Sequence, residues 1–293
     1  MRGKAFSPGH ITGFFEIFDR PKDPLRRGSR GAGVNLSLGV LSSVKASPAA
    51  RQEVNIRLNG KRGAAATTLW AVRELLGKMK LRVDVESEVQ LPVGQGLGMS
   101  AAGALSASLA LASALRIPHS LHRAAEAAHR AEVLGHTGLG DVAGQLRGGW
   151  EIRLKAGLPP RGFVDRMMVP PRKVVVCVSG RPVPTKGVLS DPARRRAVNR
   201  EGHRCMALFL EAPTLDNFFE LSYDFARRTG LASRESLLLV EEVRCRNLGM
   251  ASVSMIGNSV FATGDTPALR DLLGDRGKVF MCDTDLRGAT PVV

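Results

Sequence analysis

One glycine-rich loop followed by one helix most constrains how this chain can fold. The loop runs from Leu91 to Gly98 and has glycine at every second position from residue 94 onward. Apolar and polar residues alternate in the segment before it, 80–89, which predicts a strand. The stretch after it, 104–117, lacks glycine and proline and repeats leucine at helical spacing. The chain therefore places a flexible turn directly at the start of a helix.

A glycine-rich turn at the start of a helix is suited to binding anions. Free backbone N–H groups and the positive end of the helix dipole point at the same place. Glycine lets the backbone approach a phosphate closely, and the hydroxyl of Ser100 is suited to a metal ion or a phosphate oxygen. The glycines alone do not distinguish such a site from an ordinary turn before a helix.

The net charge of +15, from 42 basic and 27 acidic residues, raises nucleic acid as a partner. However, the basic residues are spread along the chain, and one tyrosine and two tryptophans leave little aromatic surface for base stacking. We therefore do not expect a nucleic-acid partner. We interpret the charge as an arginine-rich solvated surface, part of which could draw anionic ligands toward a cleft.

The length of 293 residues is enough for two modest domains, and 44% hydrophobic residues is typical of a globular protein. Apolar runs are too short to span a bilayer and the first residues lack a signal-peptide core, so we expect a cytoplasmic protein with no membrane partner. The four cysteines lack Cys-x-x-Cys spacing, which predicts reduced, mostly buried thiols rather than zinc ligands. A homodimer is possible, but the sequence does not indicate the oligomeric state.

The first thirty residues contain two further candidate features. Residues 4–18 are predicted to form a strand–turn–strand around the Pro-Gly pair at 8–9, and residues 19–30 a loop. Within and after this loop, residues 28–33 combine serine, arginine and three glycines, which predicts either an anion-binding lip or a surface turn. His10 is either a hydrogen-bonded histidine that shapes the turn or a contact to substrate.

Carboxylates, a histidine and an arginine follow the central helix. In the predicted helix 120–134, His129 and Glu132 lie three residues apart and project from one face. A glycine-rich turn then brings Asp141 to the start of the next element; the alternative is that Glu132 is a solvated charge and Asp141 an N-cap. Arg153, in the next predicted strand, is either a clamp for a carboxylate or a surface residue on an edge strand.

A stretch rich in proline and glycine, 155–162, marks the predicted boundary between a domain of residues 1–160 and one of residues 161–293. The order of the elements in the second domain predicts an α+β layer with helices on one face of a sheet. The remaining predicted elements are strands within 41–58, a helix at 67–78, strands at 148–154, 163–169 and 173–178, helices at 192–210, 216–229 and 233–248, a helix at 266–273 and a strand at 278–282.

The string Pro-x-x-x-Gly-Leu-Gly-x-Ser-Ala-Ala that starts at Pro92 resembles the phosphate-binding motif of the GHMP kinase superfamily, which includes galactokinase, homoserine kinase and mevalonate kinase. It is not a Walker loop, because no Gly-Lys-Ser/Thr follows the glycines. Within the superfamily, the strings 7–16 and 28–33 resemble the archaeal pantoate kinases. This chain has Met99 where the family usually has serine, and a single glycine in 254–259, where the family has a glycine-rich motif.

The resemblance covers residues 4 to about 262 and implies the α+β GHMP kinase fold. This fold has an N-terminal domain like one in ribosomal protein S5, a ferredoxin-like C-terminal domain, and an active site in the cleft between them. The resemblance also implies ATP and Mg²⁺ as cofactors, Ser100 and Glu132 as metal ligands, and Asp141 as the catalytic base. The residues implied to bind the nucleotide are Pro92, Gly94, Gly96, Leu97, Gly98, Met99, Ser100, Ala101 and Ala102.

The substrate implied by the resemblance is pantoate, phosphorylated on its 4-hydroxyl on the way to coenzyme A. The implied substrate contacts are Arg153, His129, Ser29 and His10, where His10 stands at a position that several members give to a lysine. Two alternatives remain: a GHMP kinase for homoserine or mevalonate, and a basic S5-like RNA-binding module. The RNA-binding module needs neither metal ligands nor a catalytic carboxylate, which argues against it.

Overall fold

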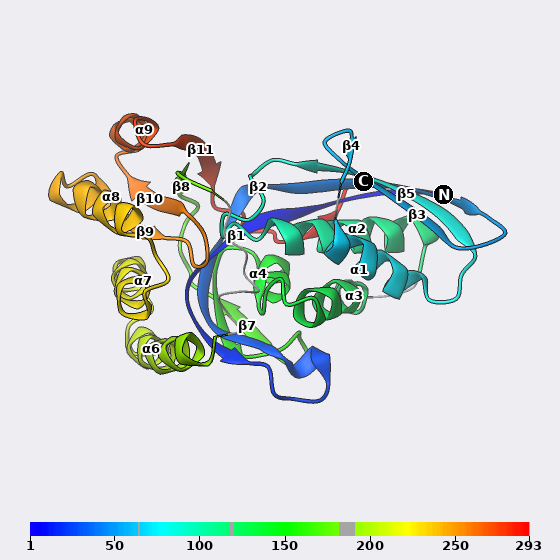
Figure 1. Ribbon diagram of the computed structural model, residues 1–293, viewed down its shortest axis with the longest axis horizontal. Helices are drawn as coiled ribbons and strands as arrows, with labels where there is room; N and C mark the ends of the chain where they lie inside the picture. The colour runs from blue at the N-terminus through cyan, green and yellow to red at the C-terminus, as the bar shows by residue number, and fades with distance from the viewer. Residues whose placement is uncertain (64, 118–119, 182–190, 293) are drawn as a thin grey trace.

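The computed structural model describes residues 1–63, 65–117, 120–181 and 191–292 (Figure 1). Within these ranges the strands form an eight-stranded and a four-stranded sheet. In the larger sheet β1 and β2 pair antiparallel over nearly their whole lengths, β2 continues the sheet to β5, and β3 lies parallel to β5. Its strands are β1 (Arg2–Phe18), β2 (Gly28–Pro48), β3 (Glu53–Leu58), β4 (Lys61–Arg62), β5 (Leu81–Val89), β6 (Trp150–Lys155), β7 (Phe163–Arg166) and β12 (Thr290–Pro291).

The prediction of a strand–turn–strand in residues 4–18 is wrong, because β1 is one continuous strand. Its pairing with β2 shifts register between Pro8 and Gly9 and again between Thr12 and Phe14. Such irregularities accommodate a proline, which has no N–H to donate, and bend a strand without reversing it. Residues 28–33 form the start of β2 rather than a turn, and the loop before them contains a short 3-10 helix, η1 (Pro24–Arg26).

Helix α2 lies against one face of the larger sheet, α1 and α3 pack on α2, and α4 lies beside β1, as Figure 1 shows. Their bounds are α1 (Ala66–Leu76), α2 (Met99–Leu115), α3 (Leu121–Leu134) and α4 (Asp141–Arg147). The predictions of α1, α2 and α3 are confirmed in type and approximate position. Alanine and serine make up most of α2, which is buried on nearly all sides. Small side chains let this helix fit between the sheet and the neighbouring helices.

The smaller sheet has the strand order β11-β8-β10-β9, and within the described residues all its pairings are antiparallel. The succession of strand, helices, two strands, helix and strand is that of a ferredoxin-like unit, as expected. Figure 1 shows the helices on the outer side of this sheet. The elements are β8 (Lys173–Val178), α6 (Pro192–Glu211), α7 (Leu215–Thr229), α8 (Arg234–Cys245), β9 (Gly249–Val253), β10 (Ser259–Gly264), α9 (Thr266–Gly274) and β11 (Lys278–Asp283).

The division between the two sheets does not coincide with the boundary predicted at residue 160. Strand β7 lies beyond that boundary, yet it pairs with β6 in the larger sheet. The late strand β12 pairs with β1 in the same sheet, so the chain returns to its first half near its end. Proline and glycine at 155–162 thus mark a connection between β6 and β7 rather than a link between sheets.

An aromatic cluster joins the two halves. Phe14 on β1 packs edge-on against Phe209 of α6, with ring centroids 5.4 Å apart, and Trp150 on β6 packs against Phe218 of α7 at the same distance. Phe218 also contacts Phe261 of β10. All five side chains are fully buried, so this cluster fixes the far end of β1 against the second half of the chain.

Two other predictions about side chains and helices are tested by the structure. The four cysteines are free thiols; Cys245 is exposed and the others are buried, as expected. Across the part of the chain that the structure describes, every helix is too short or too polar to cross a membrane.

Candidate active site

A cavity of about 370 Å³ opens where the loop before α2, the turn before α4, and strands β1 and β2 meet. The turn between β9 and β10 forms a further wall, through Met255 and Ile256. The residues that line it are Thr12, Phe15, Ser29, Val93, Gly94, Gly96, Leu97, Gly98, Met99, Ser100, Gly135, His136, Thr137, Gly138, Leu139, Gly140, Asp141, Met255 and Ile256. Segments from both halves of the chain therefore form one cavity.

The glycine-rich loop has the backbone geometry expected of an anion site. Gly94, Gly96 and Gly98 have φ angles of 79°, 72° and 68°, in the left-handed region that favours glycine. Gly98 is the N-cap of α2 and has no side chain to cap the helix, so the first N–H groups of α2 are left for a ligand. Gln145 fixes the end of the loop by donating from Nε2 to the Gly98 carbonyl at 2.9 Å.

Six of the nine residues expected to bind the nucleotide line the cavity, namely Gly94, Gly96, Leu97, Gly98, Met99 and Ser100. The Ser100 hydroxyl donates to Thr67 Oγ1 at 3.0 Å, which fixes its side chain at the start of α2. Pro92, Ala101 and Ala102 are outside the lining, and the two alanines are buried within the helix packing. Their contribution is therefore to the shape of the loop and helix.

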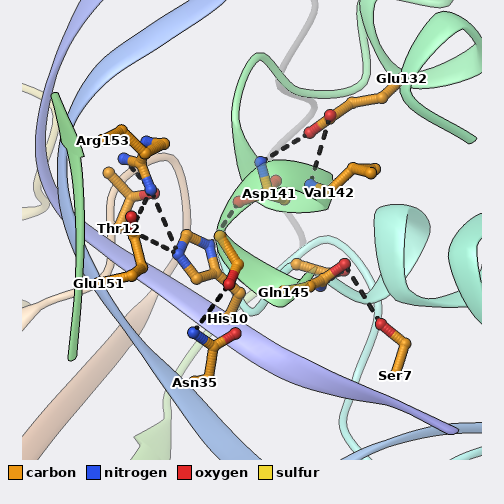
Figure 2. A network of polar contacts seen from close by, with 12 residues as sticks. Ser7, His10, Thr12, Asn35, Glu132, Asp141, Val142, Gln145, Glu151 and Arg153 are labelled. Carbon is orange, nitrogen blue, oxygen red and sulfur yellow. Dashed lines mark hydrogen bonds and ion pairs between the residues drawn. The ribbon is translucent and has the colours of Figure 1, made fainter. Parts of the chain in front are cut away.

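Asp141 is the first residue of α4 and lines the cavity, with a quarter of its side chain exposed. It is therefore not the N-cap, a position that Gly140 occupies. His10 is fully buried, and its Nδ1 lies 2.8 Å from Asp141 Oδ1. Figure 2 shows His10 at the centre of a polar network with Asp141 on one side. The ring thus holds Asp141 in one orientation.

The second nitrogen of His10 contacts a carboxylate that the sequence analysis did not single out. His10 Nε2 lies 3.0 Å from Glu151 Oε1, and Glu151 is fully buried on β6. Burial lowers the pKa of His10, but hydrogen bonds to Asp141 and Glu151 outweigh it and raise the pKa above its ordinary value. Both ring nitrogens face carboxylates, and Nε2 also lies 3.3 Å from Nη1 of Arg153, so the ring joins two carboxylates and a guanidinium in one buried cluster.

Arg153 completes this cluster and differs from both expectations, since it is neither exposed nor part of the cavity lining. Its Nη1 donates to Glu151 Oε1, and its Nη2 donates to Thr12 Oγ1 at 3.4 Å. Glu151 and Arg153 are two residues apart on one strand, so their side chains lie on the same face of the sheet. This spacing was the only feature of the sequence that could have indicated the pair. His10 likewise lies outside the lining, and the structure gives it no direct access to a ligand in the cavity.

Glu132 is fully buried, which excludes the interpretation of a solvated helix charge. Its Oε1 accepts the backbone N–H of Asp141 at 2.9 Å, and its Oε2 accepts that of Val142 at 3.4 Å. The carboxylate therefore satisfies the free N–H groups at the start of α4 and holds Asp141 in place. Burial, followed by the nearby charge of Asp141, raises the pKa of Glu132.

The geometry around Gly138 tests whether Mg²⁺ would fit here. A Cβ atom at Gly138 would lie 2.5 Å from Glu132 Oε1 and 2.9 Å from Asp141 Oδ2. Gly138 lines the cavity, so only this glycine separates the cavity from the buried carboxylate of Glu132, whereas Asp141 and Ser100 line the cavity themselves. Carboxylate and hydroxyl oxygens are hard donors of the kind that Mg²⁺ prefers, so the chemistry of these residues fits the ion.

His129 differs from the prediction of a substrate contact. Its side chain is completely buried, and it does not line the cavity. Its Nε2 donates to the carbonyl oxygen of Arg27 at 3.1 Å, and its Nδ1 lies 3.8 Å from Glu132 Oε2. Burial lowers the pKa of His129 to about 4, so the ring is neutral near pH 7. In this position His129 holds the loop before β2 through its hydrogen bond to Arg27.

Two hydroxyls form the polar wall of the cavity opposite the phosphate-binding loop. Ser29, which the sequence predicted, and Thr12, which it did not, both line the cavity. A Cβ atom at Gly140 would touch Ser29 Oγ and would lie 2.9 Å from Arg153 Nε. The glycine therefore leaves these groups close to the cavity surface, and the positive charge of Arg153 lies directly behind it.

The substitution Glu151→Gln keeps the shape of the side chain but removes its negative charge. We expect it to lower the free energy of unfolding by about 3–5 kcal/mol, because it leaves the Arg153 guanidinium buried without this anion. The double substitution Glu151→Gln with Arg153→Met removes both charges and should recover part of this loss. Urea unfolding followed by circular dichroism measures both.

Glu53→Gln is the matched control, because Glu53 pairs with Arg51 on the surface. Its effect should stay within about 0.5 kcal/mol. An equally small effect of Glu151→Gln would show that the buried ion pair is not a structural element of the site.

Comparisons with known proteins agree with this geometry. A family model described as the N-terminal domain of GHMP kinases matches residues 64–149. A pantoate kinase of Thermococcus kodakarensis is 36% identical over 97% of this chain and 93% of its own length. A pantoate kinase of Methanocaldococcus jannaschii is 32% identical over 95% of this chain and 98% of its own length.

Among solved structures, a phosphotransferase related to the coenzyme A biosynthesis pathway superimposes with a TM-score of 0.89 at 31% identity. The match covers 100% of this chain and 99% of that chain. The similarity in sequence and in fold therefore extends from end to end of the chain. The chain belongs to the GHMP kinase family, in the group that contains the archaeal pantoate kinases.

Proposed function

We propose that this protein transfers the γ-phosphoryl group of ATP to the 4-hydroxyl of pantoate, giving 4-phosphopantoate for coenzyme A synthesis. The observation that carries the proposal is the position of Asp141, which lines the cavity together with the open start of α2. A phosphate bound by that helix start and an alcohol next to Asp141 would share one enclosed space. End-to-end similarity to pantoate kinases supports the choice of pantoate.

The nucleotide phosphates would bind at the glycine-rich loop. The backbone N–H groups at the start of α2 are preorganised donors, and they can stabilise charge on the transferred phosphoryl group. Ser100 and Glu132 would hold Mg²⁺, which supplies positive charge to the phosphate oxygens when it is bound. ATP as phosphoryl donor agrees with the cytoplasmic location expected from the sequence.

Asp141 would accept the proton of the 4-hydroxyl of pantoate while the oxygen of that hydroxyl attacks the γ-phosphorus. The bond between that phosphorus and the β–γ bridging oxygen breaks, and ADP leaves with the electron pair. Oδ1 of Asp141 is held by His10, while Oδ2 lies on the side of Gly138 and the cavity. Because His10 holds one oxygen of the carboxylate, the other oxygen would face the alcohol in a fixed orientation.

The carboxylate of pantoate would bind on the wall formed by the hydroxyls of Ser29 and Thr12. Arg153 lies behind this wall and donates to Thr12 Oγ1, so it would attract the carboxylate through its charge and orient the hydroxyl. His10 would act through Asp141 rather than by touching the substrate, and His129 would hold the chain at Arg27. These roles replace the direct substrate contacts expected of the two histidines.

Asp141→Asn should lower kcat for pantoate phosphorylation by a factor of about 10²–10⁴, because an amide of the same shape accepts a proton poorly. Its affinity for ATP, measured by isothermal titration calorimetry, should stay near that of the wild type. Asp165→Asn, which changes an exposed carboxylate on β7, is the control. Wild-type turnover by Asp141→Asn would rule out the role of this residue in the reaction.

Ser100→Ala and Glu132→Gln should each raise the Mg²⁺ concentration that gives half-maximal activity, since each removes or weakens an oxygen ligand. Ser113→Ala is the matched control, because it removes an exposed serine hydroxyl near the other end of α2. Its Mg²⁺ titration should match that of the wild type. Unchanged titrations for Ser100→Ala and Glu132→Gln together would argue against a metal ion at this place.

A further inference from the structure

Gln95 lies in the middle of the phosphate-binding loop and points away from the cavity. Its side chain is 3% exposed, and Gln95 is the residue between Gly94 and Gly96 that does not line the cavity. Its amide Nε2 donates to the carbonyl of Gly180 at 3.1 Å, and its Oε1 accepts the backbone N–H of Asn258 at 3.3 Å. Both partners belong to the second half of the chain.

The backbone of Gln95 is held by the same region. Its carbonyl oxygen accepts the hydroxyl of Ser259 at 2.8 Å and that of Ser254 at 3.1 Å. These serines lie at the two ends of the turn that joins β9 to β10. Four hydrogen bonds thus connect one loop residue to the second half, two through its side chain and two through its carbonyl.

The turn between β9 and β10 also packs directly on the loop. A Cβ atom at Gly257 would overlap the carbonyl group of Gln95 and would lie 2.6 Å from the N atom of Gly96. Only glycine permits this close approach of the turn to the loop. Gly257 is the single glycine of residues 254–259.

A loop with glycine on both sides of Gln95 is intrinsically flexible, because glycine has access to more backbone conformations than other residues. A flexible loop loses affinity when it has to be ordered on binding a ligand, and restraints that order it beforehand reduce this cost. The bonds to Gln95 supply such restraints from outside the loop. Its neighbours Gly94 and Gly96 can then keep the conformation that directs their backbone at the ligand.

We propose that Gln95 is a positioning residue that fastens the phosphate-binding loop to the β9–β10 turn and to Gly180, and so preorganises the loop for the phosphates of the nucleotide. The proposal rests on the proposed function as far as ATP and pantoate are concerned. It assigns the second half of the chain an indirect part in phosphate binding, exerted through Gln95, in addition to the cavity wall that Met255 and Ile256 form.

Gln95→Met tests this, because methionine has a similar length and apolar stem but makes neither amide hydrogen bond. We expect the KM for ATP and the Kd for ADP to rise on the order of 10-fold, since two hydrogen bonds that order the loop are lost. The KM for pantoate should stay within about twofold of the wild type, because the proposed pantoate wall is formed by other residues. Steady-state kinetics and calorimetry with ADP measure these constants.

Gln90→Met is the matched control. Just before the loop, the Gln90 side chain accepts the backbone N–H of Gly39 at 2.9 Å and donates to Glu88 Oε1 at 3.1 Å, and the loss of these two bonds should leave the Kd for ADP unchanged. Ser259→Ala is a second, milder variant that removes one bond to the Gln95 carbonyl. It should raise the Kd for ADP by about threefold and keeps the test decisive if Gln95→Met does not fold.

An unchanged Kd for ADP in both Gln95→Met and Ser259→Ala would overturn the proposal, even if their melting temperatures fall, because the residue would then be structural only. An equal rise in the KM for ATP and for pantoate would overturn it as well. The calorimetric test is independent of the acceptor, so a wild-type protein that fails to phosphorylate pantoate would contradict the proposed function and leave this test valid.

Discussion

The arrangement of the active site depends on the two hydrogen bonds made by the ring of His10. One joins it to Asp141 at the start of α4 and the other to Glu151 on β6, so a residue of β1 connects two separate elements at the cavity. The ring is buried, and a buried polar group is stable only when it has hydrogen-bond partners. Glu151 in turn neutralises Arg153, so the orientation of the catalytic carboxylate and the charge behind the substrate wall depend on the same buried cluster.

The long strand β1 allows this cluster to form. Two register shifts along it, at Pro8 and after Thr12, bend the strand so that His10 and Thr12 reach the site. Beyond them the aromatic side chain of Phe14 packs against helices of the second half. The same strand therefore supports the larger sheet, the active site and the contact between the two halves. The bonds of Gln95 add a second connection between those halves, at the other wall of the cavity.

Features that depend on local sequence could be predicted. The glycine-rich loop, the start of α2 and the pairing of Glu132 with the turn before Asp141 follow from short-range spacing, and helices of the second half begin at caps such as Asp191 and Ser233. The same reasoning failed at residues 8–9, because a Pro-Gly pair usually marks a turn, whereas here a long partner strand imposes continuous pairing.

Features that depend on distant contacts could not be predicted from the sequence. Glu151 gave no motif, and its partner His10 lies 141 positions away in the chain. Arg153 and His129 are buried because β1, β2 and η1 cover them. Their residue types alone do not indicate that they are buried. Gln95 stands at an unspecified position of the phosphate-binding motif, between Gly94 and Gly96, and its hydrogen bonds reach residues next to the smaller sheet.

The most direct test of the account is the release of ADP by the purified wild-type protein with ATP, Mg²⁺ and one acceptor at a time. The acceptors are pantoate, homoserine and mevalonate, each varied over a range of concentrations to obtain kcat/KM. The account predicts that pantoate gives the highest kcat/KM and that its product carries phosphate on the 4-hydroxyl. ADP release that is faster with homoserine or mevalonate, or that is the same with and without pantoate, would contradict it.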